Sequence, residues 1–326
     1  MKPRVGFLGV GWIGRHRMEA MLATGAIQAV AVCDPSPECS AEAARLAEGV
    51  AVVSTYDALL EQPLDGLVIA TPSALHAEQS IAALERGLAV FCQKPLGRNA
   101  AEARAVVDAA RTADRLLGVD LSYRRTAAAE AIAPLLRSGE LGEIFAADLT
   151  FHNAYGPDKD WFYDRAKSGG GCVIDLGVHL VDLELWVLGF PEVVRVSSQL
   201  LAEGRPMPAG GVEDYAVAHL ELAGGGVVRL ACSWRLPAGQ EAVIEASFYG
   251  SKGGAALRNV GGSFYDFAAR RFAGTASELL VEPPDAWGGR AAADWAIRLG
   301  KDARFDPEAE RLVDVAEVLD RIYAGR

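Results

Sequence analysis

The sequence predicts an α/β protein of two domains: a doubly wound parallel sheet covered by helices, then an α/β domain built on a large, open, mainly antiparallel sheet. Three observations support this. Up to residue 121, short apolar runs alternate with helical stretches, which is typical of parallel strands buried on both faces. Beyond it, apolar and polar residues alternate as in half-buried antiparallel strands. The 326 residues also exceed what one core usually serves. We expect domains at 1–121 and 122–326.

In the first domain, predicted strands and helices alternate in a regular order. The predicted strands are apolar runs at residues 4–8, 28–33, 50–53, 66–70, 88–92 and 116–121. The predicted helices are residues 13–23, 41–48, a short helix capped near Ser54-Thr55, 75–86 and 101–114. Several of these helices end at a glycine, which tolerates a left-handed terminus. Because crossovers between parallel strands are right-handed, the helices must cover both faces of the sheet.

The second domain has a different rhythm. Residues 126–137 are predicted to be helical, and residues 144–152 alternate as a strand. A helix follows the run Gly169-Gly170-Gly171, and further strands are predicted at 192–201, 214–222, 227–234 and 242–248. Glycine-rich connections between strands favour an open antiparallel sheet, and residues 306–324 are predicted to form a terminal helix.

Composition excludes several classes of protein. Hydrophobic residues make up 51% and charged residues 23%, as in ordinary globular chains. A net charge of −11 repels phosphate backbones, so no nucleic-acid partner is expected. No apolar run approaches the ~18 residues of a membrane span, and the N-terminus lacks signal-peptide features. The five cysteines are scattered without a CxxC pair, which predicts reduced thiols in a cytoplasmic protein rather than disulfides or a zinc site.

A glycine-rich turn predicts a dinucleotide site. Gly9-Val10-Gly11-Trp12-Ile13-Gly14 follows the first strand and opens a helix, and Asp34 ends the second strand. Gly9 permits the turn, Gly11 lets a pyrophosphate approach the backbone, and Gly14 allows close helix packing. The alternative is a set of turn glycines that bind nothing.

Asp34 favours NAD over NADP as the cofactor. A carboxylate at this position accepts hydrogen bonds from the ribose hydroxyls of NAD and repels a 2′-phosphate. The residues that follow, Pro35-Ser36-Pro37, include no Arg or Lys that could bind that phosphate.

Two longer motifs resemble the glucose-fructose oxidoreductase / inositol 2-dehydrogenase (Gfo/Idh/MocA) family. The first comprises residues 71–76 (TPSALH) and 87–96 (GLAVFCQKPL), and the second is residues 169–182 (GGGCVIDLGVHLVD). The resemblance implies a Rossmann domain, then an open-sheet domain that commonly forms a subunit interface, hence a homodimer or homotetramer. It also implies oxidation or reduction of sugars, inositols or related polyols with NAD or NADP. The expected cofactor-binding residues are Gly9, Gly11, Trp12, Ile13, Gly14, Asp34, Thr71, Pro72, His76, Gln93 and Lys94.

The candidate catalytic residues are Lys94, Asp175 and His179. Asp175, His179 and Asp182 are spaced i, i+4, i+7, so on a helix they share one face. An imidazole beside a carboxylate suits a general base, which makes His179 the proton acceptor and Asp175 its orienting group. Lys94 follows a strand at the crevice of the parallel sheet and can stabilise charge on the reacting oxygen. The resemblance implies the same roles.

Other interpretations of these residues stay open. His179 could be a core histidine, Lys94 a solvated lysine at a strand end, and His76 a surface residue at a helix N-terminus. Asp175, His179 and Asp182 could bind a divalent ion, although the family chemistry needs no metal and none is expected.

The motif departs from the family at Gln93, where a glutamate usually precedes the Lys-Pro pair. The amide keeps hydrogen-bonding capacity but lacks the negative charge beside Lys94. Aromatic and polar residues that precede the glycine run Gly169-Gly170-Gly171 are candidates for the substrate wall. The predicted substrate residues are Tyr123, Asn153 and Trp161, with Arg124, His152 and Tyr155 as further candidates.

Three functions are compatible with these motifs. The preferred one is an NAD-dependent oxidoreductase that transfers hydride to or from a secondary hydroxyl carbon of a sugar, inositol or related polyol. The alternatives are NAD-recycling glycoside cleavage on the same scaffold and a non-catalytic sensor of NAD or sugar. Fold alone does not separate them. Net accumulation of NADH separates the first from the second, and Lys94, Asp175 and His179 argue against the third.

Overall fold

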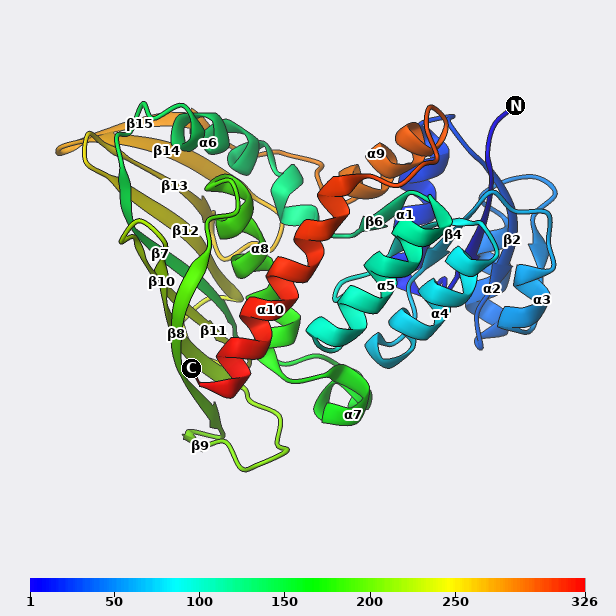
Figure 1. The fold of residues 1–326 in the computed structure, drawn as a ribbon, viewed down its shortest axis with the longest axis horizontal. Helices are drawn as coiled ribbons and strands as arrows, with labels where there is room; N and C mark the ends of the chain where they lie inside the picture. Colours follow the sequence, from blue (N-terminus) through cyan, green and yellow to red (C-terminus); the bar gives the residue numbers. More distant parts are fainter. Residues whose placement is uncertain (326) are drawn as a thin grey trace. The chain divides into compact units, whose positions relative to one another are not determined.

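The computed structural model describes residues 1–325, which form two compact units. The first unit is Met1–Leu121 with Gly289–Val313, and the second is Ser122–Gly288 with the residues from Asp314 onward. Each unit contains its own sheet (Figure 1). The first segment of the first unit ends at Leu121, and the residues Gly289–Val313, which were expected in the second domain, also belong to the first unit.

The first unit is a doubly wound parallel sheet. Its six strands run in the order β3-β2-β1-β4-β5-β6, so the strand order reverses between β1 and β4. The strands are β1 (Arg4–Leu8), β2 (Gln28–Cys33), β3 (Ala51–Val52), β4 (Gly66–Ile69), β5 (Ala89–Cys92) and β6 (Leu117–Val119). Every pairing among them is parallel. The predicted class of this domain is therefore confirmed.

Helices cover this sheet on both faces. They are α1 (Trp12–Ala23), α2 (Pro37–Ala44), α3 (Tyr56–Leu60), α4 (Ser73–Glu85), α5 (Ala100–Ala113) and α9 (Arg290–Leu299), with the 3₁₀ turn η4 (Pro307–Glu310). Figure 1 shows α4 and α5 side by side, and α1 packs against α9. Helix α2 begins four residues before the predicted start, because the Ser36 side chain caps it by accepting from the Cys39 N–H and Pro37 fits the first turn.

Helix α9 returns to the first unit because of its apolar stripe. Ala292, Trp295, Ala296 and Leu299 are spaced i, i+3, i+4, i+7 and are buried in one core with strands β1 and β5. The Trp295 ring lies so close to Gly118 that any side chain at Gly118 would collide with it.

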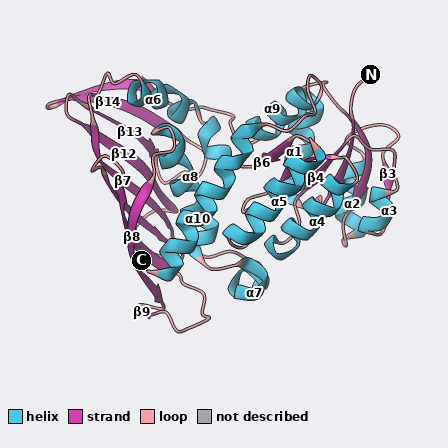
Figure 2. Ribbon diagram, viewed as in Figure 1, coloured by secondary structure: helices cyan, strands magenta, loops and turns pink. Residues whose placement is uncertain are grey.

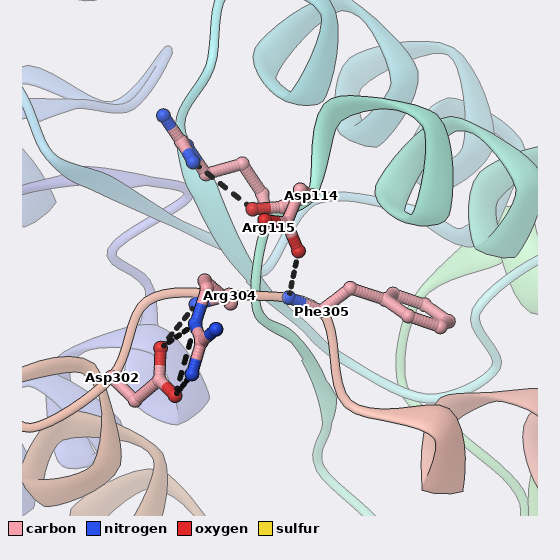
Figure 3. A network of polar contacts seen from close by, with 5 residues as sticks. All are labelled: Asp114, Arg115, Asp302, Arg304 and Phe305. Atoms are coloured by element: carbon pink, nitrogen blue, oxygen red, sulfur yellow. Dashed lines mark hydrogen bonds and ion pairs between the residues drawn. The ribbon is translucent and has the colours of Figure 1, made fainter.

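A polar anchor holds the segment after α9. The backbone N–H of Phe305 donates to the Asp114 carboxylate at 3.1 Å, as Figure 3 shows. Nearby, Arg304 and Asp302 form an ion pair on the same loop. The N–H of Leu116 donates to the Ala303 carbonyl at 2.7 Å, which adds a backbone contact to the turn before β6.

The second unit contains a nine-stranded sheet in the order β15-β14-β13-β12-β7-β11-β10-β8-β9. Its strands are β7 (Ile144–Asn153), β8 (Val193–Ala202), β9 (Arg205–Pro206), β10 (Tyr215–Leu222), β11 (Val227–Ser233), β12 (Ala242–Gly250), β13 (Gly254–Asn259), β14 (Phe267–Ala273) and β15 (Ala276–Val281). Only β7 and β11 pair in parallel; the other pairings are antiparallel. This mainly antiparallel sheet was predicted, but β9 and β13 to β15 were not.

Helices lie along one face of this sheet (Figure 2). The helical elements are η1 (Ser122–Arg125), α6 (Ala127–Arg137), η2 (Asp160–Tyr163), α7 (Arg165–Ser168), η3 (Val173–Gly177), α8 (Val178–Val187) and α10 (Arg311–Ala324). Along β10, buried residues alternate with exposed or half-buried ones, so only one face is fully covered. Among residues 1–325, no helix combines the length and apolarity that crossing a membrane requires.

Helix α8 buries a carboxylate in this second core. Glu184 is fully buried, and neither of its carboxylate oxygens has a hydrogen-bond partner among the described residues. Burial raises the pKa of Glu184 from 4.5 to about 8. The native state therefore holds this side chain as a neutral acid over a pH range in which the unfolded chain ionises it.

This carboxyl predicts a pH dependence of stability. The contribution of Glu184 to the free energy of unfolding is fully present below pH 4.5 and is lost as pH rises toward about 8. This loss is on the order of a few kcal/mol. We expect Glu184→Gln to flatten this decline, which urea unfolding between pH 5 and 8.5 measures. The exposed Glu192 gives the control, since Glu192→Gln should leave the slope unchanged. A Glu184→Gln protein with the wild-type slope would contradict the assignment.

Candidate active site

The dinucleotide motif residues follow the carboxyl ends of the strands of the first unit. One backbone hydrogen bond links each strand end to the next across the sheet. The bonds are Gly9 N to Cys33 O, Ala70 N to Leu8 O, Gln93 N to Ile69 O and Asp120 N to Cys92 O, at 2.8–3.0 Å. The segments after β1, β4, β5 and β6 therefore lie in one row, along the edge where open parallel sheets bind ligands.

The three glycines of the turn differ in what surrounds them. Gly9 has a φ of +79°, and Gly14 lies against the carbonyl of Gly9, so neither position has room for a side chain. At Gly11, by contrast, nothing lies within 4 Å of where a Cβ would be. The space beside Gly11 is open, as the approach of a pyrophosphate requires, and α1 begins directly after it with its N–H groups toward that space. The residues present therefore fit a dinucleotide.

Asp34 also holds the glycine turn. Its carboxylate accepts hydrogen bonds from the N–H of Val10 and the N–H of Ser36, both at 2.8 Å. These bonds fix both oxygens beside the turn and leave further lone pairs for a ribose. Trp12 is exposed at the start of α1, and its ring stacks on His16 with ring centroids 6.0 Å apart.

His76 is buried rather than a surface residue at the helix N-terminus. Its ring nitrogens lie 2.7 Å from two backbone oxygens, those of Thr71 and Pro95. Burial lowers the pKa of His76, an effect that the two backbone hydrogen bonds oppose. The imidazole contacts the backbone of both the segment after β4 and the segment after β5. We therefore expect His76 to affect a bound cofactor by positioning these two segments.

Gln93 belongs to a buried polar cluster. Its side-chain nitrogen donates to the Asp120 carboxylate at 2.5 Å, and Nε of Arg17 donates to the same oxygen at 2.6 Å. Asp120 and Arg17 are 1% and 7% exposed. Lys94 follows Gln93 and is half-buried. The amide at position 93 thus binds a carboxylate that directly follows the neighbouring strand β6, a partner that the sequence did not reveal.

In the second unit, Asp175 and His179 flank a change in helix type. Asp175 lies in the π-helical turn Val173–Gly177, and His179 lies in the first turn of α8. The regular α-helical spacing assumed from sequence therefore does not hold there. Single π turns inside helices are frequent at functional sites. The indole N–H of Trp234 donates to the Asp175 carboxylate at 3.1 Å and orients it.

Aromatic rings surround His179. The imidazole is 9% exposed, with ring centroids 4.6 Å from Tyr123 and 6.3 Å from Phe151. Tyr123 also packs against Phe267 and Trp287. Burial, and then the Asp175 charge, raises the pKa of Tyr123, so its hydroxyl stays protonated. The ring of Tyr123 therefore supports the imidazole, which the sequence analysis had not foreseen for this residue.

The glycine run before Asp175 is needed for packing within the protein. A side chain at Gly170 would overlap the Tyr323 hydroxyl, and one at Gly171 would overlap the backbone of Glu213. The Glu213 carboxylate accepts from the N–H groups of Gly171 and Val173 at 2.9–3.0 Å. Glu213 thereby anchors the start of the π turn.

Asp182 has a structural partner. Both of its oxygens accept from the guanidinium of Arg124, one of them at 2.7 Å, and Asp182 is 1% exposed. The Arg124 guanidinium also lies over the rings of Trp186 and Phe190. A carboxylate held in this way is unsuited to complete a metal triad with Asp175 and His179, and Arg124 is removed from the substrate-wall candidates.

Of the remaining candidates for substrate contact, two lie on opposite faces of β7 and Trp161 lies in the turn η2. Asn153 follows Phe151 on the helix-covered face of β7, and its buried Oδ1 accepts no hydrogen bond within residues 1–325. His152 points to the opposite face, where it contacts Ser233 at 2.8 Å and stacks on Tyr215. Trp161 stacks on Phe162 at 3.8 Å, and Phe162 meets the Trp234 ring edge-on.

Sequence reasoning missed four supporting residues: Arg17, Asp120, Glu213 and Trp234. Asp120 and Trp234 contact the candidate residues Gln93 and Asp175. Arg17 acts through Asp120, and Glu213 holds the backbone that leads into Asp175. Asp120 alone carried a local signal, because it is a carboxylate near the end of the apolar run 116–121, the last predicted strand of the parallel sheet.

Comparisons with known proteins agree with both units. A model described as an oxidoreductase family with an NAD-binding Rossmann fold matches residues 3–121, and the GFO/IDH/MocA C-terminal domain matches residues 130–256. D-glucoside 3-dehydrogenase of Escherichia coli (strain K12) is 30% identical over 78% of this chain and 76% of that protein. Inositol 2-dehydrogenase of Rhizobium meliloti (strain 1021) is 30% identical over 79% and 76%.

A solved structure matches the whole chain. Levoglucosan dehydrogenase in complex with NADH and levoglucosan aligns with a TM-score of 0.84, over 100% of this chain and 97% of that one. The sequence identity is 23%, so the match establishes a shared fold.

Proposed function

Because the chain belongs to the Gfo/Idh/MocA family of NAD-binding oxidoreductases, we propose that it transfers hydride between NAD and a secondary hydroxyl or carbonyl carbon of a sugar, inositol or related polyol. The observation that carries this proposal is the placement of Asp175, whose carboxylate Trp234 orients, in the π turn that leads directly into the helix of His179. The first unit of the same chain has an open dinucleotide turn at Gly11. Its relatives include a glucoside 3-dehydrogenase and an inositol 2-dehydrogenase, which supports a cyclic polyol substrate.

The proposed roles follow from the chemistry of alcohol oxidation. The carbon loses a hydride and its oxygen loses a proton, and NAD, when bound, supplies the hydride acceptor. His179 accepts the proton, and the Asp175 carboxylate stabilises the imidazolium that results. Lys94 donates a hydrogen bond to the reacting oxygen and stabilises its developing charge. The same steps in the opposite direction reduce a carbonyl group.

The substrate contacts are also proposed. The buried Oδ1 of Asn153 has no donor among the described residues and fits a substrate hydroxyl. Tyr123 and Trp161 supply aromatic surface of the kind on which sugar C–H faces rest. Because Tyr123 also supports His179, loss of its ring should affect both binding and rate.

A substrate panel tests the proposed function. The protein is incubated with NAD and a series of glucosides, free sugars, inositols and linear polyols, and NADH absorbance is followed. We expect net NADH with at least one cyclic polyol. Bond cleavage in a glycoside without net NADH would favour NAD-recycling cleavage. Binding of NAD and sugar with neither reaction would favour a sensor.

Asp34 is proposed to set the preference for NAD over NADP. In the wild type we expect a lower Kd for NAD than for NADP, because the carboxylate repels a 2′-phosphate. Asp34→Ala should bring the two Kd values closer together, mostly by weakening the binding of NAD. The substitution also removes the acceptor for the Val10 and Ser36 N–H groups. Titration of both cofactors measures the ratio. Equal wild-type affinities would contradict the role.

We propose a homodimer or homotetramer formed through the open face of the second sheet. Val227 and Tyr249 lie on this face, on either side of Ala146, and are 52% and 37% exposed. Light scattering on the wild type and on Tyr249→Glu tests this, with a smaller particle expected for the variant. A monomeric wild type would contradict it.

The five cysteines are free thiols, which supports the expected location in a reducing cytoplasm.

A further inference from the structure

We infer that Asp120 is a positioning residue of the cofactor site, which fixes the Gln93 amide so that its carbonyl oxygen serves as an acceptor for the carboxamide nitrogen of the nicotinamide. The inference rests on the proposed function, because it assumes that NAD binds at this edge of the first sheet. It assigns a role to Asp120 and to its partner Arg17, neither of which belongs to the sequence motifs.

The orientation of the amide follows from its partner. Nε2 of Gln93 donates to Oδ2 of Asp120 at 2.5 Å. The flipped amide would place a carbonyl oxygen against a carboxylate oxygen, a repulsive contact, so the hydrogen-bond network selects one orientation. With Nε2 committed to Asp120, Oε1 is directed away from this carboxylate and is left to accept another donor.

Arg17 holds the carboxylate in place. Nε of Arg17 donates to the same Oδ2 at 2.6 Å, and the side chains of Arg17 and Asp120 are 8% and 1% exposed. A buried carboxylate requires such a counter-charge. The second oxygen, Oδ1, is buried and has no hydrogen-bond partner among residues 1–325. Among the described residues, the carboxylate is therefore held through Oδ2, the oxygen that also accepts from Gln93.

The strand order identifies the donor. The turn after β1 receives the pyrophosphate, and Asp34 after β2 receives the adenosine ribose, so the adenosine half lies toward β2 and β3. The nicotinamide half must then lie on the other side of the switch point, toward β4, β5 and β6. Gln93 follows β5 and Asp120 follows β6. The nicotinamide carboxamide carries N–H donors, and the Gln93 carbonyl oxygen is the acceptor left for one of them.

The same contacts explain why an amide stands at position 93. A glutamate there would bring a carboxylate oxygen to about 2.5 Å from Oδ2 of Asp120. Two carboxylates so close cannot both stay ionised, and Arg17 can balance only one. At position 93 this chain therefore presents a neutral carbonyl and keeps the negative charge on Asp120, after the neighbouring strand.

Reciprocal substitution tests the inference. NADH binding is titrated by fluorescence between pH 6 and 9 for Gln93→Glu, Asp120→Asn and the double variant. Each single change should raise the Kd about tenfold, the scale of one lost or unsatisfied hydrogen bond. The Gln93→Glu defect should lessen at lower pH as one carboxylate takes up a proton. The double variant should return to within about threefold of wild type, because it restores an amide–carboxylate pair with the direction reversed.

Two controls separate positioning from folding. Gln28→Glu adds the same charge on an exposed residue at the opposite edge of the sheet and should leave the Kd unchanged. Gln93→Met keeps the Asp120–Arg17 pair and should raise the Kd while leaving the Tm near that of wild type. If the two single changes combine additively, or if Gln93→Met binds NADH normally, the inference is overturned. A wild type that binds no NADH would overturn the proposed function and the inference together.

Discussion

Replacing His179 with alanine is expected to lower kcat for alcohol oxidation about a hundredfold or more and to remove the rise in kcat with pH. Loss of the hydroxyl proton requires a base, and positioned general bases contribute factors of this size. In the wild type, kcat should increase over the pH range in which an imidazole loses its proton. His179→Ala should flatten this rising limb of the kcat–pH profile, while the affinity for NAD changes little.

The groups that support His179 predict graded effects. Asp175→Asn should lower kcat less than His179→Ala and move the limb to lower pH, because an amide no longer favours the imidazolium. Trp234→Phe removes the N–H that donates to Asp175, together with part of the indole, and keeps a ring against Phe162 and Tyr163. Its effect should be the smallest of the three.

A histidine on the open face of the second sheet provides the matched control. His219 is exposed, so His219→Ala should leave both kcat and the pH profile unchanged. Since interacting groups titrate as a set, the assignment rests on the variants rather than on the wild-type curve. A His179→Ala protein that keeps the wild-type limb and rate would move the base role to Lys94 or to a water.

Replacing Lys94 with methionine is expected to lower turnover at least a hundredfold while NAD binding stays nearly intact. The ammonium is proposed to act on charge that develops at the reacting oxygen, and one such donor is worth roughly 10²–10³ in kcat. Methionine keeps much of the stem of the side chain but cannot donate a hydrogen bond. The defect should therefore appear in kcat and not in the Kd for NAD.

The same unit offers a control for Lys94. Lys301 is an exposed lysine, and Lys301→Met should leave kcat and NAD affinity at wild-type values. Lys94→Arg keeps the charge but changes its geometry and is expected to recover only part of the rate. Near-normal turnover of Lys94→Met would show that this lysine is a bystander at the strand end.

The sequence determined the first sheet and the outline of its ligand site. Strands buried on both faces leave continuous apolar runs, and these runs alone predicted the order of elements from β1 to β6. Gly9 and Gly14 could be predicted from the sequence because the turn itself requires them: Gly9 has a positive φ, and Gly14 lies against the carbonyl of Gly9. Such features depend on neighbours in the chain, so local pattern carries them.

The tertiary structure decided which residues support the chemistry. Gln93 meets Asp120 after 27 residues, Trp234 meets Asp175 after 59, and Glu213 meets Gly171 after 42. Hydrophobic periodicity shows which face of an element is buried, but it does not name the partner of a buried polar group. That partner is fixed only when distant strands and helices come together, and burial then favours a hydrogen bond for most polar groups.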